Sequence, residues 1–133
     1  MRPVLSALAV GAALAVPLPL PPTALAADPP YDAALVRLSE ILGALQYLGP
    51  LCGVARPTEW RDQMEALLAA ESPSADRQAR LTAAFNGGYQ GFAALYRRCT
   101  PSAELAIERY RAEGSKLTRE VTTRYGGDAA PPR

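Results

Sequence analysis

The stretch from Ser74 to Cys99 constrains the fold of this chain more than any other part of the sequence. Its apolar residues recur at alternating steps of three and four, which is the period of a helix with one buried face. We therefore expect this stretch to form the longest helix and to lie at the centre of the fold. The residues of the stripe are Leu81, Phe85, Gly88, Phe92, Leu95, Tyr96 and Cys99.

Three glycines interrupt the same helix, at Gly87, Gly88 and Gly91. Each glycine weakens a solvated helix by about 1 kcal/mol relative to alanine. A cluster of this kind therefore predicts one of two structures. Either another helix packs closely at this point, or the helix bends within the segment Gly87–Gly91.

The other apolar stripes predict three further helices, each with recognisable ends. Gly49-Pro50 is expected to end the first helix, because proline cannot continue a helix and disfavours helical geometry in the residue before it. Asp28 or Asp32 is expected to cap its start, and Ser74 and Thr100 to cap the third and fourth helices. These further helices are expected at residues 31–48, 57–71 and 101–125.

The fold class that follows is all-α, because the sequence has no alternating run of β-branched residues. Four helices with short connections favour an up-down-up-down bundle. In that topology the first and third helices run parallel, so Cys52 and Cys99, just after their ends, lie at the same end of the bundle. We expect a disulfide between them because they are an even pair of cysteines in a chain that is expected to be exported, and the topology supports this pairing independently. A reactive thiol pair is the weaker alternative, since there is no CxxC motif and no histidine.

Residues 1–27 have the pattern of a cleavable signal peptide. A positive start is followed by an uncharged apolar run from Val4 to Val16, by prolines, and by Ala24-Leu25-Ala26. The run is shorter than the roughly 20 residues that span a bilayer, so a membrane anchor is disfavoured. The expected organisation is a signal peptide at 1–27, a helical domain at 28–126 and a disordered tail at 127–133. The expected location is the periplasm, with no transmembrane segment in the mature chain.

Charge and residue types argue against several functions. Without Arg2 the 14 basic residues become 13, equal to the 13 acidic ones, so a nucleic-acid partner is not expected. The chain has no histidine, which removes the commonest general base and metal ligand. Glu104 and Glu108 share a helix face, but a solvated face explains them better than a catalytic pair. We therefore expect a non-enzymatic protein with no cofactor and no metal.

The remaining candidate is a surface of tyrosine, tryptophan and arginine, the residue types that dominate protein interfaces. It leads to a hypothesis of a non-enzymatic interaction module that binds another envelope protein. The aromatic residues of this set could instead simply fill the core around the glycines. The candidate residues are Trp60, Arg61, Asn86, Tyr89, Tyr96 and Arg97.

Two other functions remain open at this stage. One is a small-molecule or glycan-binding module that uses an inter-helix cleft near Gly88, lined by Trp60, Asn86 and Tyr89. The other is an enzyme acting on the cell wall through a carboxylate such as Glu104 or Glu113. The sequence specifies neither the partner nor the oligomeric state.

Several short patterns occur in one order along the chain: ILGALxYL with LCG, WRxxM, FNxGY and YxxCT. Together they resemble an uncharacterised family of small exported proteins from alphaproteobacteria, with a domain of unknown function. The resemblance runs from Tyr31 to Gly126. It implies export, supports the disulfide and supplies no activity. The matching positions are Leu51, Cys52, Gly53, Trp60, Arg61, Met64, Phe85, Asn86, Gly88, Tyr89, Tyr96, Cys99, Thr100, Tyr110, Glu113, Gly114 and Tyr125.

Overall fold

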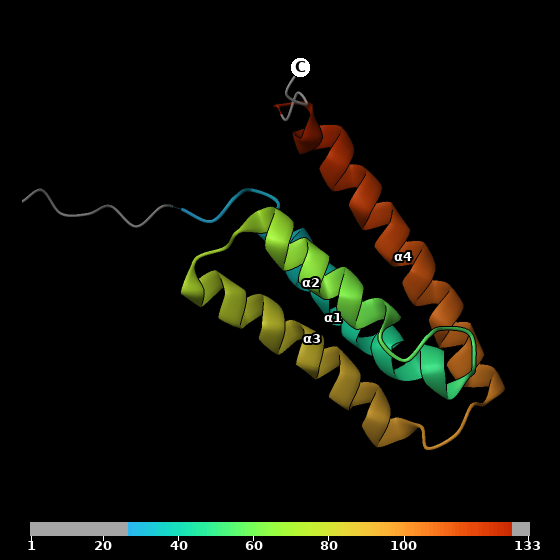
Figure 1. Cartoon of the computed structure of the whole chain (residues 1–133). Coiled ribbons are helices and arrows are strands. Elements are labelled where there is room, and N and C mark those ends of the chain that lie inside the picture. Colours follow the sequence, from blue (N-terminus) through green and yellow to red (C-terminus); the bar gives the residue numbers. More distant parts are fainter. Residues whose placement is uncertain (1–26, 129–133) are drawn as a thin grey trace, which may run out of the picture.

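The computed structural model describes residues 27–128, and this part of the chain is helical without any strand (Figure 1). A short 3-10 turn, Gly126–Asp128, follows the last helix. The expected signal peptide and the end of the expected tail lie outside the described residues. The helices are α1 (Asp32–Leu51), α2 (Glu59–Glu71), α3 (Ala75–Leu95) and α4 (Pro101–Tyr125). The predicted all-α class is confirmed.

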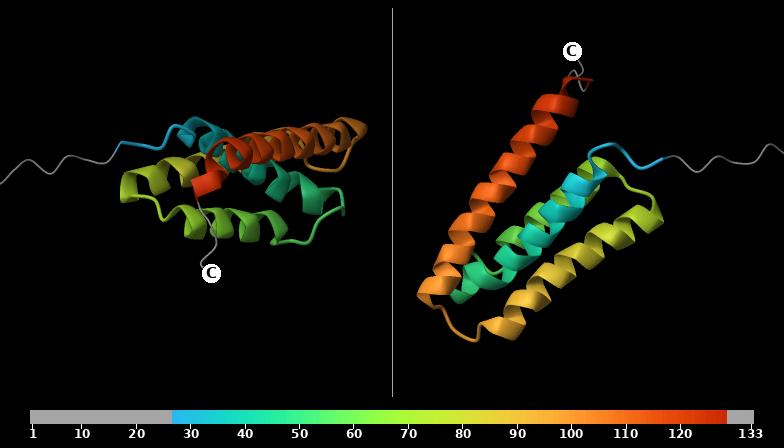
Figure 2. Two further views of the ribbon diagram at one scale, coloured as in Figure 1. Left: turned by 90° about the horizontal axis from the view of Figure 1, so that it is seen from above. Right: turned by 180° about the vertical axis from the view of Figure 1, so that it is seen from behind.

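The central helix is α1, and the longest is α4 with 25 residues, so the expectation that the Ser74–Cys99 helix would be both was wrong. Eleven of the 20 residues of α1 are buried, against four of the 21 in α3. Helix α1 packs against each of the other three, and it lies between α3 and α4 (Figure 2). Among the described helices no other pair forms an extended contact, as neighbours in a regular four-helix bundle would.

Two apolar clusters share α1 and form the core. On one side, residues of α1 meet α2 and α3; on the other, they meet α4. An apolar helix with polar residues at few positions can supply both clusters because it is buried on more than one face. The first cluster is Leu35, Leu42, Met64, Leu81 and Phe85, and the second is Ile41, Leu45, Leu48, Ala103 and Ile107.

Helices α1 and α3 touch through glycine on both sides. A Cβ atom at Gly88 would lie 2.0 Å from the carbonyl oxygen of Glu40, and one at Gly43 would lie 1.8 Å from that of Phe85. Helix α3 runs without a break through Gly87–Gly91. Of the two structures that the glycine cluster predicts, close packing is therefore the one that forms. Gly87 and Gly91 face open space.

The first helix continues past the expected stop at Gly49-Pro50 and ends at Leu51. Proline is tolerated there because the last turn closes in other ways. The carbonyl oxygen of Pro50 accepts a hydrogen bond from the Gly53 N–H at 3.1 Å, and the carbonyl oxygen of Gly49 accepts one from the Val54 N–H. Gly53 has a φ of +67°, the left-handed conformation that commonly ends a helix. The stop is therefore Gly53 and not Gly49.

The predicted caps are correct for two helices and wrong for one. The hydroxyl oxygens of Ser74 and Thr100 accept hydrogen bonds from the backbone N–H groups of Arg77 and Ala103, at 3.3 and 3.1 Å. Helix α1 has no side-chain cap. Asp32 instead accepts a hydrogen bond from the Arg77 side chain, so a long-range ion pair replaces the local interaction.

Helix α3 ends at Leu95, four residues earlier than predicted. Tyr96 turns extended, and its carbonyl oxygen accepts a hydrogen bond from the hydroxyl of Tyr47 on α1. The chain then crosses to the end of α1, where Cys99 and Cys52 form a disulfide with their Cα atoms 4.9 Å apart. The predicted pairing of the two cysteines is confirmed.

Candidate functional site

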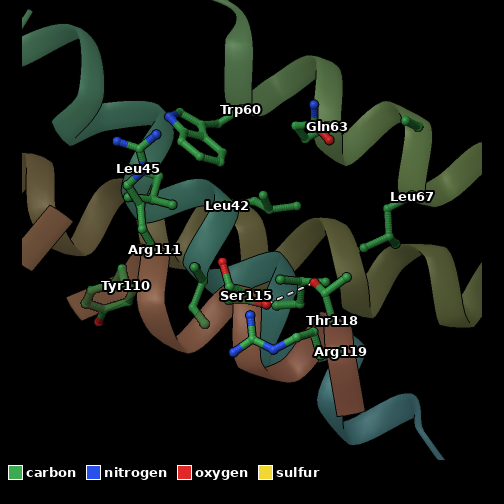
Figure 3. A pocket seen from close by; sticks show the side chains of 14 residues that line it. Leu42, Leu45, Trp60, Gln63, Leu67, Tyr110, Arg111, Ser115, Thr118 and Arg119 are labelled. Atoms are coloured by element: carbon green, nitrogen blue, oxygen red, sulfur yellow. Dashed lines mark hydrogen bonds between the residues drawn. The ribbon is translucent and has the colours of Figure 1, made fainter. Parts of the chain in front are cut away.

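A groove lies between α2 and α4, beside the central helix (Figure 3). Its volume is about 630 Å³, and α1 forms its floor. We call it the α2–α4 groove. It is lined by Leu38, Ile41, Leu42 and Leu45 of α1, by Trp60, Gln63, Ala66 and Leu67 of α2, and by Tyr110, Arg111, Gly114, Ser115, Thr118 and Arg119 of α4.

The floor and the α2 wall of this groove are mostly apolar, whereas the α4 wall carries polar and basic groups. The guanidinium of Arg111 lies over the ring of Trp60, 5.7 Å from its centre, which is a cation–π contact across the groove. The hydroxyl of Thr118 donates to the carbonyl oxygen of Gly114 at 2.9 Å. Figure 3 shows Arg119 beside Ser115 at the other end of this wall.

The groove carries positive charge without a matching carboxylate. None of its fourteen lining residues is acidic. Within residues 27–128, neither Arg111 nor Arg119 forms an ion pair, although Arg37, Arg77 and Arg80 all do. An anionic group of a bound partner would therefore find an uncompensated arginine here.

Trp60 reaches the groove because Gly49 on α1 leaves room for its indole. A Cβ atom at Gly49 would lie 3.1 Å from Nε1 of Trp60 and 2.7 Å from Cβ of Ala55. The indole N–H is buried against α1 and has no hydrogen-bond partner in the described structure. The glycine that seemed to be a helix stop therefore has a packing role.

Gln46, which the sequence analysis did not select, holds the start of α2 in place. This buried side chain donates through Nε2 to the carbonyl oxygen of Pro57, and its Oε1 accepts from the backbone N–H of Arg61 at 2.8 Å. A buried amide with both ends bonded to another segment fixes the position of that segment. The only sequence signal was a polar residue between Leu45 and Leu48.

The six residues of the predicted surface do not come together on one face. Trp60 lines the α2–α4 groove, whereas Asn86 lies on the exposed face of α3, in a separate shallow hollow. The side chain of Arg61 is exposed, as is that of Arg97 after the end of α3.

The two tyrosines of the set do meet, through Tyr47 of α1. Its ring lies edge-on to that of Tyr89, with centres 5.3 Å apart, and its hydroxyl donates to the Tyr96 carbonyl oxygen. Tyr96 also stacks on Phe92, so it belongs partly to the core. Tyr89 remains 38% exposed.

The structure corrects the prediction of a cleft near Gly88. The backbone of α1 occupies the space beside Gly88, with Glu40 in direct contact. Trp60 is therefore not grouped with Asn86 and Tyr89. The inter-helix hollow lies instead on the other side of α1, between α2 and α4.

The carboxylates considered for catalysis lie outside the groove. Glu113 accepts two hydrogen bonds from the guanidinium of Arg37, at 2.7 and 2.9 Å. These bonds hold the pKa of the Glu113 carboxyl below its ordinary value, against a smaller opposing effect of burial. Glu104 and Glu108 are exposed. The described residues contain no group of three or more acidic or cysteine side chains placed to hold a metal ion.

None of the helices within residues 27–128 combines the length and the apolar character needed to cross a bilayer. The described fold is that of a small all-helical protein with one disulfide and an apolar groove beside its central helix. The chain belongs to the family described as Protein of unknown function (DUF2385), whose model matches residues 30–125. No curated protein and no solved structure matches the chain.

Proposed function

We propose that this protein is a non-enzymatic binding module of the cell envelope, and that its partner occupies the α2–α4 groove. One observation carries the proposal: a cavity of about 630 Å³ with an apolar floor and two arginines that no described carboxylate pairs. Binding sites are typically concave, of about 300–1,000 Å³, with apolar walls and a few polar groups that orient the ligand. The groove has each of these properties.

The side chains of the groove support binding rather than catalysis. Its fourteen lining residues include no carboxylate, histidine or cysteine, so no general base stands among them beside the hydroxyls of Ser115 and Thr118. The Thr118 hydroxyl is already used as a donor to Gly114. Glu113 is held by Arg37 as an ionised carboxylate, which suits structure better than acid catalysis.

The proposed compartment is the periplasm. Two features support it: the Cys52–Cys99 disulfide, which is typical of oxidising compartments, and the signal-peptide pattern of residues 1–27. In this proposal the mature chain starts near Ala27. The proposed topology of its four helices is up-down-up-down, so that consecutive helices run in opposite directions. The proposed origin is an alphaproteobacterium.

A second candidate function is docking of another envelope protein along α3. Its exposed face carries Asn86 and Tyr89, and Leu95 near its end is 74% exposed. Arg97 follows just after the end of the helix. Exposed large apolar side chains beside arginine and tyrosine are typical of protein interfaces. This candidate retains part of the predicted surface, without Trp60.

Site-specific photocrosslinking distinguishes the two candidates. A benzophenone amino acid is placed at Ser115 in the groove, at Ala83 on the exposed face of α3, or at Arg109 on α4 outside the groove. Cells that produce each variant are irradiated, and adducts of the protein are identified by mass spectrometry. Arg109 is the control, because it shares the helix and the exposure of Ser115 but does not line the groove.

An adduct that forms from Ser115 and not from Arg109 supports the α2–α4 groove as the binding site. An adduct that forms from Ala83 alone supports the second candidate and contradicts the first. Equal labelling from all three positions would contradict both, because it would mean nonspecific contact. The mass of the purified protein gives its first residue, and a start far from Ala27 would contradict the proposed export.

A further inference from the structure

We propose that the ligand of the α2–α4 groove is a single-chain amphiphile with an anionic head group, either a carboxylate or a phosphate. This inference rests on the proposed function, because it names the occupant of that same groove. Three observations carry it: the apolar floor along α1, the charge on the α4 wall, and the size of the cavity.

The apolar part of the ligand lies along α1. The floor runs from Leu38 to Leu45, which is about 10 Å at 1.5 Å per helical residue. Opposite this floor, Gly114 contributes no side chain. A Cβ atom there would lie 3.4 Å from Cγ2 of Ile41, so the glycine lets α4 lie close to α1 beside the groove. The room for the alkyl chain lies between this part of α4 and the α2 side chains that line the groove, among them Trp60 and Leu67.

The head group lies at Arg119. Arg111 is already in contact with the face of the Trp60 ring, whereas Arg119 has no ion-pair partner within the described chain. The exposed hydroxyl of Ser115 lies on the same wall, one helical turn away. An arginine and a hydroxyl together provide donors for a carboxylate or phosphate at the edge of the apolar floor.

The volume favours an alkyl chain over a partner helix. A helix with its side chains is about 10–12 Å wide, so a 10 Å length of it fills roughly 800 Å³ or more. The cavity offers about 630 Å³, so a helix would enter only if α2 and α4 moved apart. A single alkyl chain is much narrower than a helix and needs no such movement.

Intrinsic fluorescence provides the test, because Trp60 is the only tryptophan of the chain and lines the groove. The protein is expressed from the full 133-residue sequence, purified, and titrated with dodecanoate, dodecyl phosphate, decanoate and dodecanol. Each anionic probe is kept below its micelle concentration and dodecanol below its solubility limit. Vesicles of phosphatidylglycerol form a separate arm. Calorimetry provides an affinity that does not depend on the indole.

We expect dodecanoate or dodecyl phosphate to shift the Trp60 emission and to bind with one site. Decanoate should bind about 15-fold more weakly than dodecanoate, because it has two methylenes fewer and each buried methylene changes affinity about fourfold. Arg119→Gln should weaken binding of the anionic probes about tenfold and leave dodecanol unchanged. Arg109→Gln is the matched control, with the same charge change on the same helix outside the groove.

The inference is overturned if dodecanol binds as tightly as dodecanoate, if Arg109→Gln acts like Arg119→Gln, or if only the vesicles bind. Absence of binding by every probe, together with a Ser115-specific adduct in the crosslinking experiment, rejects the amphiphile and retains the proposed function. Absence of both rejects the proposed function as well.

Discussion

At the scale of single residues, neighbouring glycines on α3 have opposite surroundings. Gly88 faces α1, where its lack of a side chain lets the two backbones touch. Gly87 and Gly91 face open space. The close approach needs one glycine on α3, and Gly43 completes it from α1. The outward glycines make no contact that their small size would explain, and the structure offers no packing reason for them.

This difference predicts opposite effects of one substitution at adjacent positions. Gly87→Ala should raise the free energy of unfolding by up to about 1 kcal/mol, through helix propensity alone. Gly88→Ala should lower it by about 1–3 kcal/mol or more, because its Cβ would overlap the Glu40 carbonyl oxygen. Urea denaturation measures both. Gly91→Ala is the control and should behave as Gly87→Ala; stabilisation by Gly88→Ala would contradict the observed helix contact.

The pair of Arg37 and Glu113 makes stability depend on pH. Because the pKa of Glu113 is lowered in the folded state, its contribution is present above the unfolded pKa of about 4.5 and is lost as the pH falls through the folded value. Both side chains are more than one-third exposed, so the effect should stay below about 1 kcal/mol. The melting temperatures of the wild type and Glu113→Gln should therefore differ at pH 7 and converge toward pH 3.

Glu108→Gln provides the comparison for that experiment. Glu108 lies on the same helix, is exposed, and forms no ion pair within residues 27–128. Its substitution should leave the melting curve nearly unchanged at each pH. A difference between wild type and Glu113→Gln that stays constant from pH 7 to pH 3 would show that the Arg37 bond is not its source.

At the scale of elements, the position of α2 depends on a few contacts with α1. Helix α2 is the shortest of the four, with 13 residues, and only Met64 is buried among them. Its start is fixed by Gln46, which bonds to Pro57 and Arg61, and by Trp60, which fits against Gly49. These contacts set the width of the groove, because α2 forms one of its walls.

Gln46→Met should therefore loosen α2 more than it disturbs the rest of the fold. It keeps the size of the side chain but removes the acceptor of the Arg61 N–H and the donor to Pro57. We expect a loss of about 1–3 kcal/mol in the free energy of unfolding. The emission of Trp60 should shift to longer wavelength, since the indole becomes more exposed to water. Gln90→Met, on the exposed face of α3, is the control; equal effects of the two substitutions would contradict this role.

At the scale of the whole molecule, the disulfide adds a connection to a fold in which one helix, α1, makes nearly all the contacts between helices. Helices α2, α3 and α4 are connected mainly through their common contacts with α1. The Cys52–Cys99 bond links the end of α1 to the segment between α3 and α4. It thereby fixes the end of the molecule at which the second apolar cluster begins.

Reduction should therefore destabilise the fold strongly. The two cysteines are 47 residues apart, and closing a loop of that size is worth about 4 kcal/mol in the chain-entropy estimate. Thermal melts with and without reductant, combined with thiol labelling, measure the effect. The double variant Cys52→Ala with Cys99→Ala should melt near the reduced wild type and ignore reductant. Free thiols in the native protein would contradict the bond.

The sequence by itself determined the existence of the four helices, because their apolar residues recur with the helical period. It also determined the caps at Ser74 and Thr100, which are local hydrogen bonds, and the pairing of the cysteines, because there are only two of them. The tertiary structure alone decided which helix is central, since that depends on how many faces of α1 are covered. It also decided the ends of α1 and α3, where Gly53 and the Tyr47–Tyr96 bond override local signals.

The location of the groove also belongs to the tertiary structure. Trp60 was selected from the sequence, but Arg111, Gly114 and Arg119 were not part of the predicted surface. They become neighbours only because α2 and α4 lie on either side of α1, and such pairings of distant segments leave no periodicity in the sequence. The glycine cluster predicted a close contact as one of two alternatives, and Gly88 makes that contact. The groove between α2 and α4, which form no extended contact with each other, could not be predicted from the sequence.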